Sequence, residues 1–345
     1  MPNRMSTNKS DKQALQSLRE NDTCWPQNHE APLVSVCMIT YNHRNFIAQA
    51  IDSVLMQEVD FPVEIIIHDD CSTDGTADIV RNYAQRFPQL IRPTLQTENQ
   101  YSQGKKPLLN NFKEARGKYL ALLDGDDAWT DPHKLQKQTE CLEKHPEHIL
   151  CYGNVTCVNE KDEVLEKRKI APEHCRGLSQ EEIISCQRVI PMGSVMLRYH
   201  DILKNMPKVY FKVLNGDTFI FALLAQYGSA AYVDFTPSLY RQHAGGIYSA
   251  KTDCQKSKAR LNTYRHLYSS LAPQFRPILA KTIIAIHLSL LKLLWSKRKY
   301  CQFSSSYFYF LSFALPRQRI LCSIKDALLP FELLKDSIKK MFRRG

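Results

Sequence analysis

The sequence predicts an α/β fold: a doubly wound sheet flanked by helices, with a C-terminal α-helical extension. Strand-length apolar runs alternate with apolar stripes of helical period from residue 33 onward, and such alternation implies right-handed crossovers between parallel strands. Clusters of polar and acidic residues follow three of the runs. Because ligands of such sheets bind beyond the carboxyl ends of the strands, we expect the three clusters at one ligand-binding rim.

The elements follow one another at regular intervals. The first strand is predicted at 33–39, a near-continuous apolar run typical of a strand buried on both faces. The second strand is predicted at 63–68 and the third at 119–123. Helices are predicted after the first two strands, because apolar residues recur there at helical spacing. These residues are Ile47, Ala50, Ile51, Val54 and Leu55 in the first helix and Ile79, Val80, Tyr83 and Phe87 in the second.

Three carboxylates, Asp124, Asp126 and Asp127, directly follow the third strand. Like charges this close repel and raise one another's pKa unless a cation compensates them. Mg²⁺ or Mn²⁺ is the simplest compensation, since both prefer hard oxygen ligands and often take further ligands from a substrate's phosphates. The cluster therefore suggests a nucleotide-diphosphate site. The alternative is that these acids, with Asp131 and Pro132, only begin the next helix.

Charge is distributed unevenly along the chain. Residues 251–345 contain 19 of the 46 Lys and Arg but only four of the 35 acidic residues. The eleven cysteines include no C-x-x-C pair, and the N-terminus has no apolar signal-peptide core. These features predict reduced thiols without disulfides in a cytosolic protein. Neither a G-x-G-x-x-G nor a G-x-x-x-x-G-K-[ST] motif occurs, so dinucleotide-binding and P-loop sites are not expected.

Seven segments together resemble the bacterial inverting glycosyltransferases of family 2, which have the GT-A fold. Each segment is a weak signal alone, but their order and spacing resemble the family from residue 32 to residue 246. The segments are 34–42, 64–76 with its Asp-Asp-x-Ser-Thr-Asp core, 115–119, the Asp-Gly-Asp-Asp cluster at 124–127, 193–198, 215–217 and 239–246. The resemblance implies a GT-A domain at 32–246, with a doubly wound, Rossmann-like mixed sheet flanked by helices. Composition and pattern add a polar extension at 1–31 and a basic amphipathic helical region at 247–345.

The resemblance implies that the nucleotide is bound by Thr40, Tyr41, Asn42, Asp70 and Asp124. Tyr41 is expected to stack on or line the uracil, and Asp70 to accept a hydrogen bond from the ring N–H. Asp124 is expected at the donor ribose or at the waters of the metal. The alternative for Asp70 is a turn or helix cap. For Asp74, which precedes a helix start, the cap is the preferred interpretation.

The same resemblance implies that the acidic cluster holds Mn²⁺ or Mg²⁺. Asp126 is the first candidate ligand, Asp127 is a rival ligand, and His243 is a third candidate. Arg241 is a candidate for pairing with the diphosphate or the acceptor, because a planar guanidinium matches phosphate oxygens. For His243 and Arg241, a structural or solvated role is an equal alternative.

Asp217 is the candidate general base. An inverting transfer is a single displacement in which an acceptor hydroxyl attacks the anomeric carbon opposite the leaving nucleoside diphosphate. A carboxylate within hydrogen-bond reach can take the proton of that hydroxyl, while a metal stabilises charge on the departing diphosphate. Two separated carboxylate groups are therefore needed. The alternative for Asp217 is the N-cap of the apolar helix that it begins.

The C-terminal quarter is helical in pattern, with one apolar stripe formed by Ile283, Ile286, His287, Leu290, Leu291 and Leu294. The uncharged stretch at 301–316 is shorter than a membrane span of roughly 20 apolar residues, so no transmembrane helix is expected. The basic excess and the aromatic residues at 307–310 favour peripheral contact with the anionic inner leaflet of a bacterial cell membrane. The alternative is a helical bundle with a solvated basic face. No nucleic-acid motif accompanies the charge, so nucleic-acid binding is not expected.

The resulting hypothesis is a cytoplasmic, membrane-peripheral, metal-dependent hexosyltransferase. It would move one sugar from a nucleotide-diphosphate donor, expected to be a UDP-sugar, to a glycan or lipid-linked acceptor in surface polysaccharide or lipopolysaccharide assembly. Processive synthesis is not expected, because a Gln-x-x-Arg-Trp motif is absent. A sugar nucleotidyltransferase would need a glycine-rich loop where this chain has Tyr41-Asn42-His43-Arg44. The alternative from another class is a non-catalytic GT-A scaffold at the membrane surface.

Overall fold

The structure, a computed structural model, describes residues 31–186, 188–243, 245–246, 251–299, 302–303 and 306. The described residues fall into two compact units. The first lies within 1–180, 188–206 and 227–243, and the second within 181–187, 207–226 and 244–345. Of the predicted extension at 1–31 only Ala31 is described, and the aromatic residues at 307–310 and the basic C-terminus lie outside the described residues.

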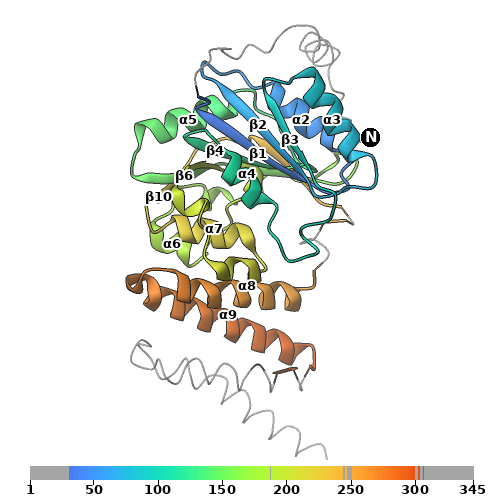
Figure 1. The fold of residues 1–345 in the computed structure, drawn as a ribbon. Helices are drawn as coiled ribbons and strands as arrows, with labels where there is room; N and C mark the ends of the chain where they lie inside the picture. Colours follow the sequence, from blue (N-terminus) through green and yellow to red (C-terminus); the bar gives the residue numbers. More distant parts are fainter. Residues whose placement is uncertain are drawn as a thin grey trace, which may run out of the picture. The chain divides into compact units, whose positions relative to one another are not determined.

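The first unit is built on a seven-stranded mixed sheet (Figure 1). In spatial order its strands are β10 (Ser229–Tyr232), β6 (His148–Tyr152), β9 (Met196–Arg198), β4 (Tyr119–Asp124), β1 (Val34–Thr40), β2 (Val63–Asp69) and β3 (Ile91–Leu95). All neighbours pair in parallel except β9, which is antiparallel to both β4 and β6. The predicted strands at 33–39, 63–68 and 119–123 correspond to β1, β2 and β4, which confirms the predicted fold class.

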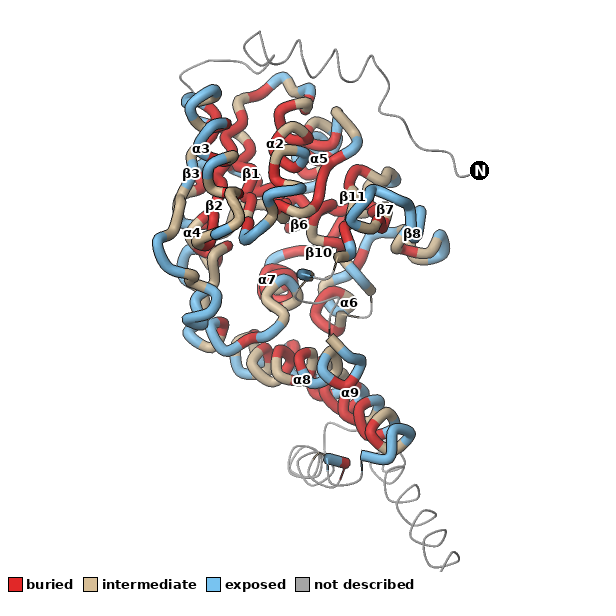
Figure 2. Tube along the Cα trace, turned by 90° about the vertical axis from the view of Figure 1, so that its right-hand side faces the viewer, coloured by how far each residue is buried: buried red, intermediate tan, exposed pale blue. Residues whose placement is uncertain are grey.

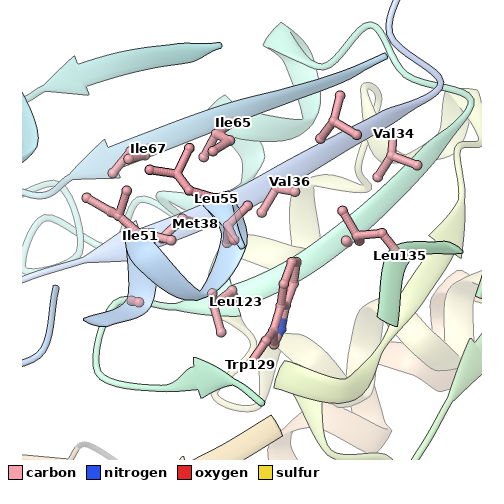
Figure 3. Close-up of a cluster of buried hydrophobic side chains, with 14 of the residues drawn as sticks. Val34, Val36, Met38, Ile51, Leu55, Ile65, Ile67, Leu123, Trp129 and Leu135 are labelled. Carbon is pink, nitrogen blue, oxygen red and sulfur yellow. The ribbon is translucent and has the colours of Figure 1, made fainter. Parts of the chain in front are cut away.

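Helices cover both faces of this sheet. They are α2 (Ile47–Leu55), α3 (Thr76–Arg86), α4 (Leu108–Glu114) and α5 (Lys134–Lys144). The first two are the predicted helices, and all the apolar residues predicted to line α2 are buried. Met38 and Ile65 of the sheet share one apolar cluster with Leu135 of α5 (Figure 3). Cys37 and Ile66 alternate to the opposite face and are equally buried, as expected for a doubly wound sheet.

A second, four-stranded sheet joins segments that are distant in the sequence. Its order is β5 (Ala128–Trp129), β11 (Ser238–Arg241), β7 (Val155–Val158) and β8 (Val164–Glu166). Figure 2 shows β11, β7 and β8 side by side. β11 runs antiparallel to β5, the strand that directly follows the acidic cluster. This pairing brings the chain that follows β11 close to the acidic residues.

An ionic network around the buried carboxylate of Glu64 holds the first three strands and the start of β4 together. The carboxylate of Glu64, in β2, accepts hydrogen bonds from the Ser35 hydroxyl (2.6 Å) and from the backbone N–H of Arg116 (2.9 Å). The guanidinium of Arg116 (2.7 Å) and that of Arg92 (3.1 Å) also donate to it. The Ser35 hydroxyl in turn accepts from the N–H of Gly117 (2.9 Å). Residues from three of the family-like segments therefore have a structural role.

Replacing Glu64 with Gln is expected to destabilise the protein by about 1–3 kcal/mol, because the amide loses the charge-assisted hydrogen bonds. Burial raises the pKa of Glu64, but the hydrogen bonds from Ser35 and Arg116 outweigh burial and place that pKa below its ordinary value. The stabilisation is therefore present above the pKa of the unfolded chain and is lost as the pH falls through the folded pKa. Urea unfolding at pH 7 and below pH 4.5, the ordinary value, measures both effects.

In that experiment the variant should lose stability at pH 7 and show a weaker loss on acidification than the wild type. Glu140→Gln is the matched control, since Glu140 is an exposed carboxylate that pairs with Lys144 within α5, and its unfolding midpoint should not change. If Glu64→Gln and the wild type lost the same free energy of unfolding between pH 7 and acid pH, the stabilising role of the Glu64 carboxylate would be contradicted.

The second unit is helical. Its main elements are α7 (Gly216–Leu224), α8 (Asp253–Ser270) and α9 (Arg276–Ser296). Helix α8 begins with a capping box in which Thr252 and Gln255 satisfy each other's backbone N–H groups. The apolar stripe predicted between Ile283 and Leu294 is buried in α9 and is confirmed. The short elements of the chain are α6 (Gln180–Ile184) and the 3₁₀ turns Pro172–His174, Met192–Ser194, Asp201–Leu203, Lys208–Lys212 and Pro273–Phe275.

One described helix, Pro273–Ser296, is long and apolar enough to span a membrane by length and composition. The expectation that the chain has no transmembrane helix stays a prediction. It considered uncharged runs only, and Lys281 and Lys292 interrupt this helix. Half of its most apolar stretch is buried within the protein, and a core helix of a soluble protein meets the same criterion.

Candidate active site

The polar clusters after β1, β2 and β4 share one rim of the large sheet. Thr40, the last residue of β1, is in register with Asp69 of β2. The preceding residue, Ile39, is in register with Asp124 of β4. Because these strands are parallel, their carboxyl ends lie side by side. The prediction of a common rim is confirmed.

The Asp-Gly-Asp-Asp segment forms a tight turn against the end of β1. The N–H of Asp127 donates to the carbonyl of Asp124 (3.0 Å), and the N–H of Gly125 donates to the carbonyl of Ile39 (2.8 Å). A Cβ at position 125 would lie 2.6 Å from the Thr40 hydroxyl oxygen. Only glycine therefore allows this close approach of the two strand ends, which fixes the position of Asp126.

Two histidines approach the carboxylate of Asp126. Its Oδ2 lies 2.9 Å from Nε2 of His243, which follows β11, and 3.9 Å from Nε2 of His43, which follows β1. One possible ligand atom from each of the three side chains lies within 4.8 Å of the others. The structure thus brings together two of the predicted metal ligands, Asp126 and His243, and adds His43. The signal for His43 in the sequence is its position two residues after Tyr41, at the same strand end.

The three groups differ in protonation. Burial raises the pKa of Asp126, but the hydrogen bond from His243 and the charge interactions with His43 and His243 together outweigh burial, and that pKa lies below its ordinary value. The same hydrogen bond raises the pKa of His243. Burial lowers the pKa of His43, and its Nδ1 is buried with no hydrogen-bond partner among the described residues. An ionised carboxylate beside a neutral imidazole with an unsatisfied ring nitrogen is a donor set suited to a divalent cation.

Asp127 and Arg241 are turned toward the protein. Oδ1 of Asp127 accepts the backbone N–H of Arg241 (2.8 Å), and burial raises the pKa of this carboxyl well above its ordinary value. The buried guanidinium of Arg241 donates to the backbone carbonyl of Asp126 (2.8 Å), to Asp162 (2.6 Å) and to Gln49 (2.7 Å). In this arrangement Asp127 and Arg241 position the Asp126 turn. The predicted contact of Arg241 with a diphosphate would require it to leave these partners.

The candidate nucleotide residues lie on the adjacent part of the rim. The buried carboxylate of Asp70 accepts the backbone N–H groups of Gln100 (2.7 Å) and Tyr101 (3.0 Å), so it holds the loop that follows β3. Tyr41 and Tyr101 have exposed fractions of 44% and 46%. Both rings are therefore accessible at this rim. The sequence does not single out Tyr101, because no motif or periodicity surrounds it.

Three further polar residues named in the sequence analysis follow or end β1 and β2. Oδ1 of Asn42, which has a positive φ of 55°, accepts the N–H of Thr73 (2.8 Å) and so ties the ends of β1 and β2 together. The buried hydroxyl of Thr40 has no hydrogen-bond partner among the described residues. Oδ1 of Asp74 accepts the N–H (3.0 Å) and the hydroxyl (2.6 Å) of Thr76. Asp74 thus forms the predicted turn before α3, whereas the N-cap position of α3 belongs to Gly75.

Asp217 lies in the second unit, in the first turn of α7. Its side chain is exposed, and its Oδ1 accepts the N–H of Thr218 (2.7 Å). The N-cap position of α7 belongs to Asn215, so Asp217 is not the N-cap. Two side chains of α8 hold the segment before it, since Asn262 accepts the N–H of Leu214 (3.2 Å) and Thr263 accepts that of Asn215 (3.1 Å).

Comparison with known proteins identifies the matching region of the chain. The family model described as glycosyl transferase family 2 matches residues 35–204. Uncharacterized proteins of Mycobacterium tuberculosis and Mycobacterium bovis are 37% identical over 228 residues, which is 65% of this chain and 63% of each relative. The chain thus spans less than two thirds of those relatives' length. A putative teichuronic acid biosynthesis glycosyltransferase of Bacillus subtilis, TuaG, is 43% identical over 112 residues, 32% of this chain and 42% of TuaG.

Solved structures share the fold at low sequence identity. S. aureus TarS 1–349 in complex with UDP-GlcNAc superposes with a TM-score of 0.62 at 19% identity, covering 90% of this chain and 92% of TarS 1–349. The mannosyltransferase PcManGT from Pyrobaculum calidifontis, in complex with GDP-Man and Mn²⁺, gives a TM-score of 0.54 at 17% identity, covering 96% and 88%. These matches confirm the predicted GT-A fold.

Proposed function

We propose that this chain is a member of glycosyltransferase family 2, whose model matches residues 35–204, and that it transfers one hexosyl unit, with inversion, from a nucleotide-diphosphate sugar to a glycan or lipid-linked acceptor. The observation that carries the proposal is the cluster of Asp126, His43 and His243 at the carboxyl rim of the sheet. UDP-GlcNAc in TarS and GDP-Man in PcManGT support a nucleotide-sugar donor, and we favour a UDP-sugar. The name of TuaG supports an acceptor from surface polysaccharide assembly.

A divalent cation fits the cluster. One carboxylate oxygen and two imidazole nitrogens lie within 4.8 Å of one another. Mg²⁺ demands oxygen ligands, whereas imidazole suits transition metals, so we propose Mn²⁺ over Mg²⁺. PcManGT, which shares the fold, was solved with Mn²⁺. A cation held here would supply positive charge to the departing diphosphate.

The remaining residues act on the donor and the acceptor. The exposed rings of Tyr41 and Tyr101 offer faces for the nucleobase. Asp70 keeps Tyr101 in place through its backbone N–H, and Arg241 fixes the Asp126 turn. Asp217 takes the proton of the acceptor hydroxyl. Its position in the first turn of α7 is fixed by hydrogen bonds from α8 to the two residues before that helix.

Membrane contact is a further part of the proposal. Two features support a cytoplasmic protein that lies peripherally on the anionic inner leaflet of the cell membrane. They are the excess of Lys and Arg at 251–345 and the apolar helix Pro273–Ser296. Each basic residue near such a surface contributes on the order of 1 kcal/mol. That position would place the enzyme beside lipid-linked acceptors.

Thermal unfolding tests the donor site without an acceptor. UDP with Mn²⁺ is expected to raise the unfolding temperature more than UDP with Mg²⁺ and more than GDP or dTDP with Mn²⁺, because a ligand stabilises the state that binds it. In His43→Ala the Mn²⁺-dependent part of the shift should disappear. His133→Ala is the matched control, since His133 is exposed beside Glu58 and does not belong to the Asp126 cluster. Absence of any shift with UDP and either metal would contradict the proposed site.

A further inference from the structure

A second cluster of metal-binding side chains lies on the turn between α5 and β6. It consists of His145, Glu147 and His148, in the sequence His-Pro-Glu-His. Oε1 of Glu147 lies 3.2 Å from Nδ1 of His145 and 3.7 Å from Nε2 of His148. One ligand atom from each side chain lies within 4.8 Å of the others. A tetrahedral Zn²⁺ about 2.1 Å from each ligand places ligand atoms about 3.4 Å apart, close to the two distances measured.

The cluster is separate from the candidate active site. His148 is the first residue of β6, and Ser229, its partner in register, is the first residue of β10. Because β9 is antiparallel to both β4 and β6, β6 runs in the same direction as β4. The start of β6 therefore lies at the amino rim of the sheet, whereas Asp126 follows the carboxyl end of β4.

The ring of His148 is already oriented for metal binding. Its Nδ1 lies 2.7 Å from the hydroxyl of Ser229, and that hydroxyl donates its single proton to the carbonyl of Glu147 (3.4 Å). In the tautomer in which Nδ1–H of His148 donates to this hydroxyl, the lone pair is left on Nε2, which faces Glu147. Histidine ligands in metal sites are held in this way through their second ring nitrogen.

The backbone of the turn is also constrained. His145 is the C-cap of α5, and Pro146, with its fixed φ, follows it. The guanidinium of Arg198 donates to the carbonyl of Leu142 (2.7 Å) and to that of His148 (3.3 Å). The three ligand residues are thus carried by a turn that is fixed on both sides, while the side chains of His145 and Glu147 remain more than half exposed.

We propose that His145, Glu147 and His148 form a Zn²⁺ site in which water completes the coordination and which clamps the end of α5 to the sheet edge formed by β6 and β10. Two imidazoles and one carboxylate are a donor set that Zn²⁺ accepts. The site is independent of the proposed transferase chemistry, because none of its residues lies at the carboxyl rim.

Zn²⁺ binding to the full-length protein tests this proposal. Equilibrium dialysis with Zn²⁺ should show a bound ion, beside any ion held at the Asp126 cluster, that is lost in His148→Ala and in Glu147→Gln. Glu147→Gln is an exposed isosteric change that does not threaten folding. Ser229→Ala, which removes only the partner of His148, should weaken that binding about 10–100-fold. Zn²⁺ should also raise the unfolding temperature of the wild type and of Ser229→Ala. In Glu147→Gln the increase produced by Zn²⁺ should be smaller than in the wild type, because this site no longer binds the ion.

Three control variants separate this site from other zinc-binding groups. His243→Ala removes a ligand of the other cluster, and Cys141→Ser removes a nearby thiol whose pKa is lowered to about 7, chiefly by a hydrogen bond with Cys151. His133→Ala removes an exposed histidine paired with Glu58. The proposal predicts that all three keep the ion. It is overturned if Glu147→Gln and His148→Ala bind as much Zn²⁺ as the wild type, or if Cys141→Ser abolishes the binding.

Discussion

Replacing Asp217 with Asn is expected to lower turnover by about 10²–10⁴-fold, the usual contribution of a general base. An amide cannot accept the proton of the acceptor hydroxyl, but its oxygen can still accept the N–H of Thr218, as Oδ1 of Asp217 does (2.7 Å). The local structure should therefore persist. The measurement is the steady-state rate of nucleoside-diphosphate release at saturating donor and acceptor, with the thermal shift produced by UDP and Mn²⁺ recorded beside it.

Asp253→Asn is the matched control for this prediction. Asp253 lies in the first turn of α8, within the same unit as Asp217, and its side chain is exposed. Its replacement should leave the rate unchanged. The account predicts that Asp217→Asn loses turnover but keeps the donor-induced thermal shift. If Asp217→Asn retained turnover within a few-fold of wild type, the base would have to be another group.

Replacing Asp126 with Asn is expected to abolish metal-dependent donor binding and to lower turnover by about 10³-fold. A metal that stabilises charge on a leaving group is worth several kcal/mol, and each 1.4 kcal/mol is tenfold in rate. The amide removes the negative charge that His243 (2.9 Å) and His43 (3.9 Å) now approach. The measurement is turnover against Mn²⁺ concentration, in which the variant should require far more Mn²⁺ for any activity.

Asp131→Asn is the control for this second prediction. Asp131 follows the same acidic segment, but its carboxylate binds the N–H of His133 (2.8 Å) and the ammonium of Lys137 (2.6 Å). The Mn²⁺ dependence of Asp131→Asn should match that of the wild type. An unchanged Mn²⁺ requirement in Asp126→Asn would instead assign the metal to other acids of the rim.

The parts of the fold predicted from the sequence are those with strong local patterns. β1, β2, β4 and the first two helices follow from apolar runs and stripes, because burial imposes a period on the residues themselves. β9 has three residues, Met196–Arg198, and carries no such pattern. Its antiparallel insertion between β4 and β6 depends on long-range pairing. The mixed character of the sheet was implied by the family resemblance alone.

The site shows the same division. The motif places Asp126 after a strand, but its approach to His243, 117 residues later, depends on the pairing of β5 with β11. The motif also cannot show which backbone N–H groups reach a carboxylate. Asp70 receives those of Gln100 and Tyr101. Asp127 receives that of Arg241. Residue type and motif identify candidate site residues. Only the tertiary structure separates the candidates that position the backbone from those that face the rim.

The most direct test of the central claim is nucleoside-diphosphate release from a panel of UDP-, GDP- and dTDP-sugars with Mn²⁺ or Mg²⁺. Wild type would be compared with Asp126→Asn and Asp217→Asn, with candidate glycan and lipid-linked acceptors present. The account predicts Mn²⁺-dependent release from a UDP-sugar that both variants lose. A folded wild type that releases no nucleoside diphosphate from any donor, and that UDP with Mn²⁺ does not stabilise, would contradict the account and favour a non-catalytic scaffold.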